Sequence, residues 1–147
     1  MTSYSERLWP TPWLYVACLL FLPAVTLMLT PLSLTLGIVS ALVVYGAACW
    51  FLIGTSPRIT LDAERLTAGR ASIERRHLGE AVALSGDELT LAIGPNLDAR
   101  AHLLLRGWIK SGVLVRLTDP SDPTPYWLIS SRNPEALAAA LNGGTAA

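Results

Sequence analysis

The feature that most constrains the fold is a long uncharged run near the start of the chain. From Leu8 to Pro57 there is no Asp, Glu, Lys, Arg or His, and only Glu6 and Arg7 among the 11 basic and 11 acidic residues precede it. An uncharged apolar run of this length is typical of membrane-spanning segments rather than of a soluble core. The rest of the 147 residues leave room for one further domain of ordinary size.

Two apolar segments, residues 13–30 and 33–54, make up most of this run, and Pro31 lies between them. Each has roughly the 17 to 25 residues that a helix needs to cross a bilayer. The link is too short for other structure, so we predict a hairpin of two transmembrane α-helices. Pro23 removes one backbone donor from the first helix and predicts a kink there.

The uncharged run divides the chain into three expected regions. These are an N-terminal cytoplasmic or interfacial segment at residues 1–12, the membrane hairpin at 13–54 and a cytoplasmic domain at 56–147. Arginines flank the hairpin and its turn has none, so the positive-inside rule predicts that both termini are cytoplasmic. A cleavable signal peptide is the alternative, but the basic start is weak and a second apolar segment follows at once.

Aromatic and small residues support the hairpin. Trp9, Trp13 and Trp50 stand at the span ends that share one side of the membrane, and we predict that they anchor the headgroup layer. Gly37 and Ala41 are four residues apart on one face of the second helix, a spacing that allows self-association between copies of the chain.

The region after the hairpin reads as a series of short strands followed by a helix. The predicted strands are residues 58–61, 65–69, 70–78, a stretch around Val82 and Leu84, 101–106, 113–118 and 126–131. Residues 89–93 fit either a strand or a loose helical turn.

The last two strands are predicted to form an antiparallel hairpin. The loop "DPSDPTP" joins them, with Asp119 and Asp122 suited to Asx-turns and the prolines restricting the loop. Trp127 and Ile129 share one face, which we expect to point toward the sheet core or the C-terminal helix. The loop lacks the oxygen ligands and terminal Glu of a calcium site.

A helix at residues 134–142 is predicted to close the domain, with Asn133 as N-cap and Gly143 as stop. Short strands closed by one amphipathic helix predict a mainly-β domain, a curved antiparallel sheet or partly open barrel whose mouth the helix covers.

This order of elements resembles the pleckstrin-homology-like fold of bacterial membrane proteins. With "YSERLWPTPW" before the hairpin, "SPRITLDAERLTAGRASI" after it and "LLLRGWIKSGVLVRLTDPSDPTPYWLISSRNPEALAAAL" near the end, nearly the whole chain resembles an actinobacterial family of two-span membrane proteins, domain-of-unknown-function family 3093. The resemblance implies a multi-pass protein of the bacterial inner membrane and supplies no catalytic residues.

The sequence offers no constellation for catalysis, a metal or a cofactor. His77 and His102, both predicted on strands, have no metal-ligand spacing with Cys, Asp or Glu, and Cys18 and Cys49 lie in the apolar segments without His or acidic neighbours. There is no nucleophile elbow and no phosphate loop. A net charge of zero argues against a nucleic-acid partner. We therefore expect a non-enzymatic protein with no cofactor.

The candidate contact residues are basic and aromatic groups: Arg75, Arg76, Arg106, Trp108 and Lys110. Arginine and lysine can bind anionic headgroups, and tryptophan favours the interface. Two functions stay open. The hairpin anchors an accessory subunit or scaffold that presents its domain to a membrane-protein partner, or the domain senses anionic membrane lipids. A solvated strand face with a packed tryptophan is the alternative without a site.

Overall fold

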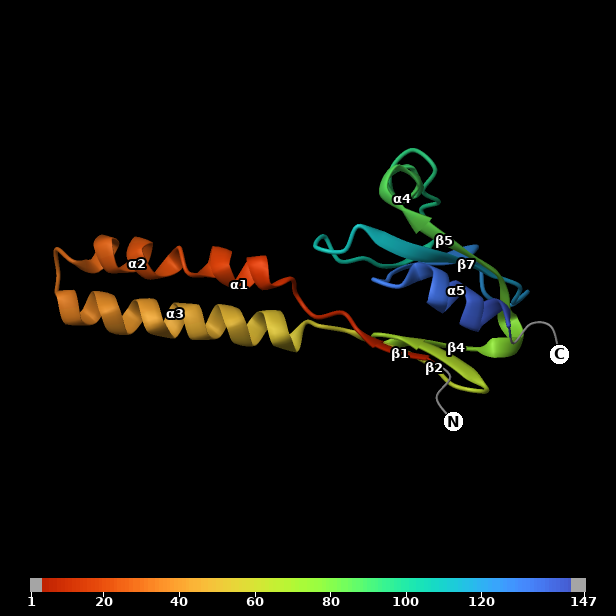
Figure 1. The fold of residues 1–147 in the computed structure, drawn as a ribbon, viewed down its shortest axis with the longest axis horizontal. Coiled ribbons are helices and arrows are strands. Elements are labelled where there is room, and N and C mark those ends of the chain that lie inside the picture. The colour runs from red at the N-terminus through yellow and green to blue at the C-terminus, as the bar shows by residue number, and fades with distance from the viewer. Residues whose placement is uncertain (1–3, 144–147) are drawn as a thin grey trace. The chain divides into compact units, whose positions relative to one another are not determined.

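The computed structural model describes residues 4–143. The chain divides into two compact units, which are considered separately. One unit is Trp9–Ser56, and the other combines Met1–Leu8 with Pro57–Ala147. The second unit is thus built from chain on both sides of the first, as the colours of its strands show (Figure 1).

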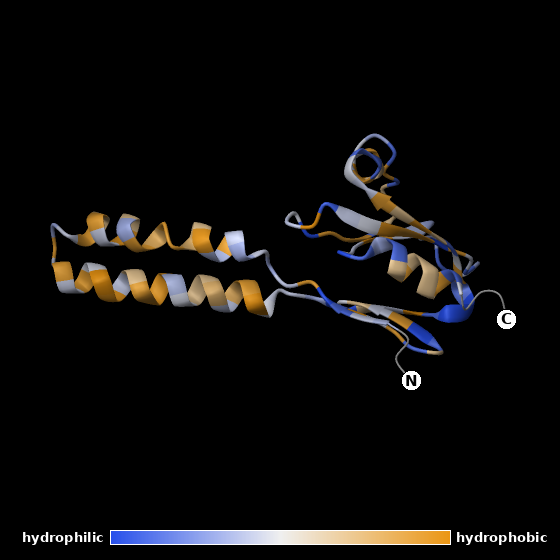
Figure 2. Cartoon of the chain, viewed as in Figure 1, coloured by the Kyte–Doolittle hydropathy of each residue, from blue (hydrophilic) through white to orange (hydrophobic). Residues whose placement is uncertain are grey.

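The first unit consists of helices built mainly of hydrophobic residues (Figure 2), and many of their large apolar side chains are exposed. Its helices are α1 (Pro12–Cys18), α2 (Phe21–Leu29) and α3 (Leu34–Gly54). Pro12–Leu29 and Leu34–Gly54 are each long and apolar enough to cross a membrane, and at most 11% of their apolar windows is buried. They differ in this respect from core helices of a soluble protein, which bury one face.

The predicted kink in the first apolar segment is confirmed, one turn before the proline. Pro23 has no N–H to offer to the Leu19 carbonyl, and Leu22 N donates to that oxygen instead at 3.1 Å. The regular ladder is interrupted at Leu19 and Leu20, which separates α1 from α2.

Gly37 and Ala41 are the only residues of α3 that the structure buries. α2 packs against this face: a methyl group added at Gly37 would lie 2.9 Å from the carbonyl oxygen of Thr26. The small side chains therefore allow two helices of one chain to approach each other. Within one chain, this face of α3 is covered by α2.

Four antiparallel strands form the first sheet of the β unit. They are β1 (Tyr4–Arg7), β2 (Arg58–Leu61), β3 (Arg65–Ala68) and β4 (Ala71–Glu74), in that order. β1 pairs with β2 so that Arg7 faces Arg58 and Tyr4 faces Leu61. Residues 4–7 were expected in a separate N-terminal segment of residues 1–12. In the structure they complete the sheet of the domain instead, while residues 1–3 lie outside the described residues.

The second sheet has the order β5, β7, β8, β6. Its strands are β5 (Leu78–Ser85), β7 (Ser111–Leu117), β8 (Tyr126–Ser130) and β6 (His102–Leu104). β6 runs parallel to β8, whereas the other pairs are antiparallel. The ambiguous stretch at residues 89–93 is helical, within α4 (Gly86–Ile93).

The predicted strand at residues 70–78 is interrupted. Arg75–His77 form a short 3₁₀ helix, η1, between β4 and β5, so His77 does not lie on a strand. His102 lies on β6, as expected. The turn η1 connects β4 of the first sheet to β5 of the second.

Both sheets contribute to one hydrophobic core, and helix α5 (Pro134–Asn142) packs on β5 and β7. Leu8, Ile59, Val113, Ile129 and Leu137 have no exposed surface. Trp127 joins Ile129 in this core, as the alternation predicts. α5 covers the residues for which the sequence predicts a helix. Asn133 occupies the N-cap position, but its side chain makes no capping hydrogen bond.

The loop between β7 and β8 contains the predicted Asx-turns. The Oδ1 of Asp119 accepts from Ser121 N at 2.8 Å, and the Oδ1 of Asp122 accepts from Thr124 N at 2.8 Å. The pKa of each carboxyl is lowered, first by a hydrogen bond with the side chain of Ser121 or Thr124 and then by the bond from the backbone N–H of the same residue. Both acids are therefore held in turn structure.

Candidate functional site

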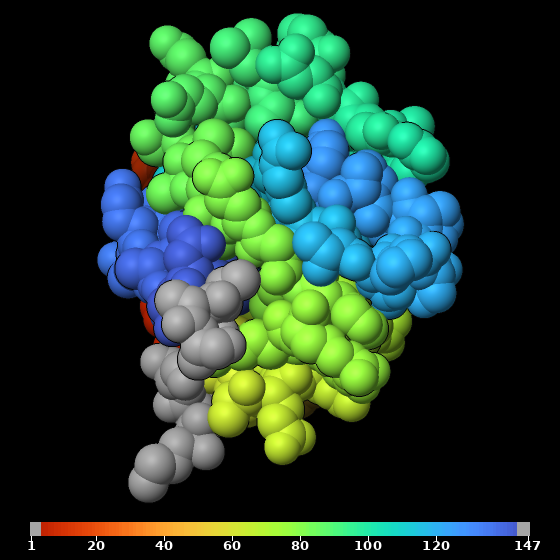
Figure 3. All heavy atoms as spheres, turned by 90° about the vertical axis from the view of Figure 1, so that its right-hand side faces the viewer, coloured from red at the N-terminus to blue at the C-terminus, as the bar shows by residue number. Residues whose placement is uncertain are grey.

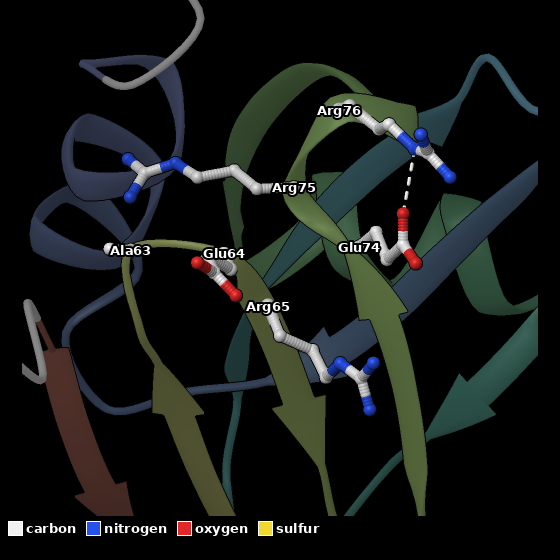
Figure 4. Close-up of a pocket in the computed structure, with 6 residues that line it drawn as sticks. All are labelled: Ala63, Glu64, Arg65, Glu74, Arg75 and Arg76. Atoms are coloured by element: carbon white, nitrogen blue, oxygen red, sulfur yellow. Dashed lines mark ion pairs between the residues drawn. The ribbon is translucent and has the colours of Figure 1, made fainter.

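A shallow depression surrounds two of the predicted contact residues, Arg75 and Arg76 (Figure 4). It has a volume of about 390 Å³ and lies between the β2–β3 turn and the end of β4. Its lining residues are Ala63, Glu64, Arg65, Glu74, Arg75 and Arg76. Figure 3 shows the face of the domain that carries this turn, in yellow, together with α5, in dark blue.

Arg75 is a structural side chain. Its Nη2 donates to the carbonyl oxygen of Ala140 at 2.7 Å, and its Nη1 donates to that of Asp62 at 3.4 Å. Cations near a helix C-terminus stabilise its unpaired carbonyls. Arg75 therefore joins α5 to the β2–β3 turn, and a headgroup would have to displace these bonds to bind it.

Arg76 points in another direction and is paired. Its Nε lies 2.6 Å from Glu74 Oε2, and both side chains are well exposed. In Figure 4 the three arginines diverge, and Glu64 lies among them. Two carboxylates and three guanidinium groups line the depression, so the net positive electrostatic potential there is weak. The three arginine side chains of the depression do not converge on a position where one anion could bind.

The other predicted residues lie in the loop between β6 and β7. The Arg106 guanidinium lies 5.9 Å from the centre of the Trp108 ring, close enough for a cation–π interaction. Arg106 N also donates to the Oγ of buried Ser130 at 3.0 Å, which fixes the loop to β8. Trp108 packs against the core and Lys110 is exposed.

This loop borders an open hollow of about 530 Å³ beside the start of α4. Asp87, Arg106 and Lys110 are its charged lining residues. The carboxylate partly offsets the two cations, and so the hollow has mixed rather than strongly basic character.

The structure divides the predicted basic surface into two. Along β5, Leu78 pairs with Leu117 at one end and Ser85 with Ser111 at the other, about 23 Å away at 3.3 Å per residue. Arg75 and Arg76 precede the first end, and Lys110 adjoins the second. The five predicted residues do not form one site.

Arginines that the prediction did not include as contacts lie at the second end. Arg7 faces Arg58 across β1 and β2, and Gly69 N donates to the Arg58 carbonyl at 2.9 Å, which places Arg70 at this end too. We call this the link end, because the chain runs from here to α1 and α3. Basic flanks were visible in the sequence, but only the strand register brings them together.

The β6–β7 loop belongs to the link end as well. A methyl group added at Gly69 would lie 3.2 Å from Leu104 Cδ1 and 3.5 Å from Pro57 Cβ. Leu104 ends β6 and leads directly into the loop that carries Arg106 and Lys110. Gly69 has φ +65, a conformation that favours glycine.

A carboxylate that the sequence did not single out joins the two termini of the domain. Glu6 Oε2 accepts from Tyr4 Oη at 2.8 Å and from Ser131 Oγ at 2.6 Å, while Glu6 Oε1 accepts from Arg132 N at 2.9 Å. Burial, together with the neighbouring Glu6, raises the pKa of Tyr4 to about 12. Glu6 thereby fixes β1 to the start of α5.

The remaining predicted positions are the tryptophans of the apolar unit. Trp9 precedes α1, Trp13 lies in its first turn and Trp50 lies near the end of α3. Their exposed fractions are 45%, 70% and 82%. Among the described residues, no group of three or more His, Cys, Asp or Glu side chains is placed to hold a metal.

The fold defines a class of protein in which two long apolar helices are inserted between the first and second strands of a two-sheet β domain. The chain belongs to the family described as Protein of unknown function (DUF3093), whose model matches residues 3–141. No curated protein and no solved structure matches the chain.

Proposed function

We propose that this chain is a non-enzymatic, two-span protein of the bacterial inner membrane with both termini in the cytoplasm. Its β domain serves as an accessory or scaffold module for a membrane-protein partner. The observation that carries this proposal is the pairing of β1 with β2, which lie on either side of the apolar helices in sequence.

Strand pairing constrains the topology. Arg7 and Arg58 can face each other only when they are on the same side of the membrane, which requires an even number of crossings between them. Two apolar helices of 18 and 21 residues provide this number. Arg7, Arg58 and Arg70 at the link end favour the cytoplasmic side under the positive-inside rule.

The same pairing argues against the other readings of the apolar run. Cleavage of a signal peptide would remove β1 and the fully buried Leu8 from the domain. A soluble-core role would need an apolar surface to cover helices whose Leu27, Met28 and Trp50 are more than 70% exposed. Burial in lipid covers these side chains without such a surface.

The polar side chains of the domain support a scaffold rather than a catalyst. Glu6 connects β1 to α5, Arg75 binds a helix carbonyl, and Asp119 and Asp122 are held in turns. A pleckstrin-homology-like relationship fits the four-strand sheet, the antiparallel β5–β7–β8 strands and the final helix. The insertion of α4 and parallel β6 departs from that simple order.

Purification from native membranes tests the scaffold role. We expect full-length protein in mild detergent to carry a membrane protein at a fixed ratio. Gly112→Val, which disrupts the β domain and leaves the apolar helices unchanged, should lose that partner, whereas Gly107→Ala should retain it. A wild-type protein that purifies alone, or a partner retained by Gly112→Val, would contradict the proposal.

A further inference from the structure

The link end of the β domain carries a cluster of cations. Arg58 and Arg70 are exposed, and Arg7 lies opposite Arg58 in the sheet. Arg106 and Lys110 reach the same end through the β6–β7 loop. The strand register and the Leu104–Gly69 contact thus gather charges that are far apart in the sequence.

The acidic side chain next to Arg7 in β1 is engaged in hydrogen bonds within the domain. Glu6, the neighbour of Arg7, accepts hydrogen bonds from Ser131 and Arg132. Asp87 lines the hollow together with Arg106 and Lys110. Arg58 and Arg70 are therefore the two cations best placed to act on an external anion.

The short connection between α3 and β2 indicates which kind of anion can reach Arg58. Only Thr55, Ser56 and Pro57 separate Arg58 from the end of α3, and each residue spans at most about 3.6 Å. If α3 crosses a bilayer, Arg58 lies within reach of the headgroup layer. Guanidinium groups bind phosphate oxygens in a bidentate way, and juxtamembrane cations are attracted to anionic lipids.

We propose that the link end is a contact surface for anionic phospholipid headgroups, with Arg58 and Arg70 as its principal residues and Arg106 and Lys110 as flanking ones. This inference rests on the proposed membrane topology. Arg58 and Arg70 take the place of Arg75 and Arg76 as the candidate lipid contacts. Arg75 and Arg76 lie at the opposite end of β5, where Arg75 binds the Ala140 carbonyl and Arg76 pairs with Glu74.

The test uses full-length protein in neutral detergent, titrated with phosphatidylglycerol or phosphatidylcholine and observed by native mass spectrometry. The ratio of the two affinities removes the contribution of apolar contacts to the helices. Arg58→Gln/Arg70→Gln should lower the preference for phosphatidylglycerol about 25-fold, or about 5-fold for each charge. Arg65→Gln/Arg76→Gln removes two exposed charges from the depression and should leave the preference unchanged.

Three results would overturn the proposal. They are an unchanged preference in Arg58→Gln/Arg70→Gln, an equal loss in the control pair, and displacement of phosphatidylglycerol by millimolar inorganic phosphate. Urea unfolding midpoints equal to wild type establish that both variants are folded. Partner retention is measured on the same preparations, so a failed lipid contact is distinguishable from a failed scaffold role.

Discussion

Glu6→Ala is expected to lower the free energy of unfolding of the β domain by about 2–4 kcal/mol, because hydrogen bonds to a charged group are worth about 1.5–3 kcal/mol each in net terms. The substitution leaves the Oγ of fully buried Ser131 without this acceptor and releases β1 from the start of α5. The measurement is urea unfolding of full-length protein in mild detergent, followed by tryptophan fluorescence.

Glu80→Ala is the matched control, because Glu80 is an exposed carboxylate on β5. It should change stability by about 0.5 kcal/mol or less. Glu6→Gln keeps an acceptor without the charge and should fall between the two. Equal stabilities for Glu6→Ala and Glu80→Ala would show that the N-terminal strand does not hold the domain together.

Gly112→Ala is expected to destabilise the domain by about 3 kcal/mol, and Gly112→Val by more, because overpacking of a sheet forces backbone shifts. Gly112 pairs with Ser130, and a methyl group there would lie 2.6 Å from the carbonyl oxygen of Ile129. β7 and β8 would have to separate in the middle of the second sheet.

Gly107→Ala provides the comparison for this substitution. A methyl group at Gly107 meets no atom within 4 Å, so the unfolding midpoint should stay close to that of wild type. The same urea titration decides the result. A Gly112→Ala protein as stable as Gly107→Ala would mean that β7 and β8 do not approach each other as described.

Local patterns in the sequence were sufficient for the elements with strong signals. The apolar segments, β2, the β7–β8 hairpin and α5 each combine a clear hydrophobic period with turn or capping residues. The Asx-turns of Asp119 and Asp122 followed from side-chain chemistry within two residues. In each case the determining interactions are close in sequence.

The missed strand, β1, and the unpredicted pairing of β6 both depend on residues that are distant in the sequence. β1 reads "YSER", and the side chain opposite buried Ile59 is a carboxylate rather than an apolar group, so no alternation marks it as a strand. The long-range partners of its carboxylate, Ser131 and Arg132, lie at the other end of the chain. β6 lies within the predicted strand of residues 101–106, but its parallel pairing with β8, which follows it much later, was not predicted.

The five contact candidates are grouped in the sequence by residue type alone, and the structure places them in two separate regions. Arg106, Trp108 and Lys110 do share one loop, and the cation–π geometry joins the first two. Arg75 and Arg76 were grouped with them by residue type, and the length of β5 separates the two groups. Arg58 and Arg70 become contact candidates only once the register of the four strands β1 to β4 is known.

The most direct measurement of the central claim is a disulfide between β1 and β2 in the full-length protein. Ser5 faces Thr60 on the outer side of the sheet, and a Ser5→Cys/Thr60→Cys protein, with Cys18 and Cys49 replaced by alanine, is oxidised in carbonate-washed membranes. We predict efficient intramolecular cross-linking, and little for Ser5→Cys/Thr67→Cys, because Thr67 lies one strand further away. Absence of the first cross-link, or equal yields for both pairs, would contradict a domain whose first strand precedes the apolar helices.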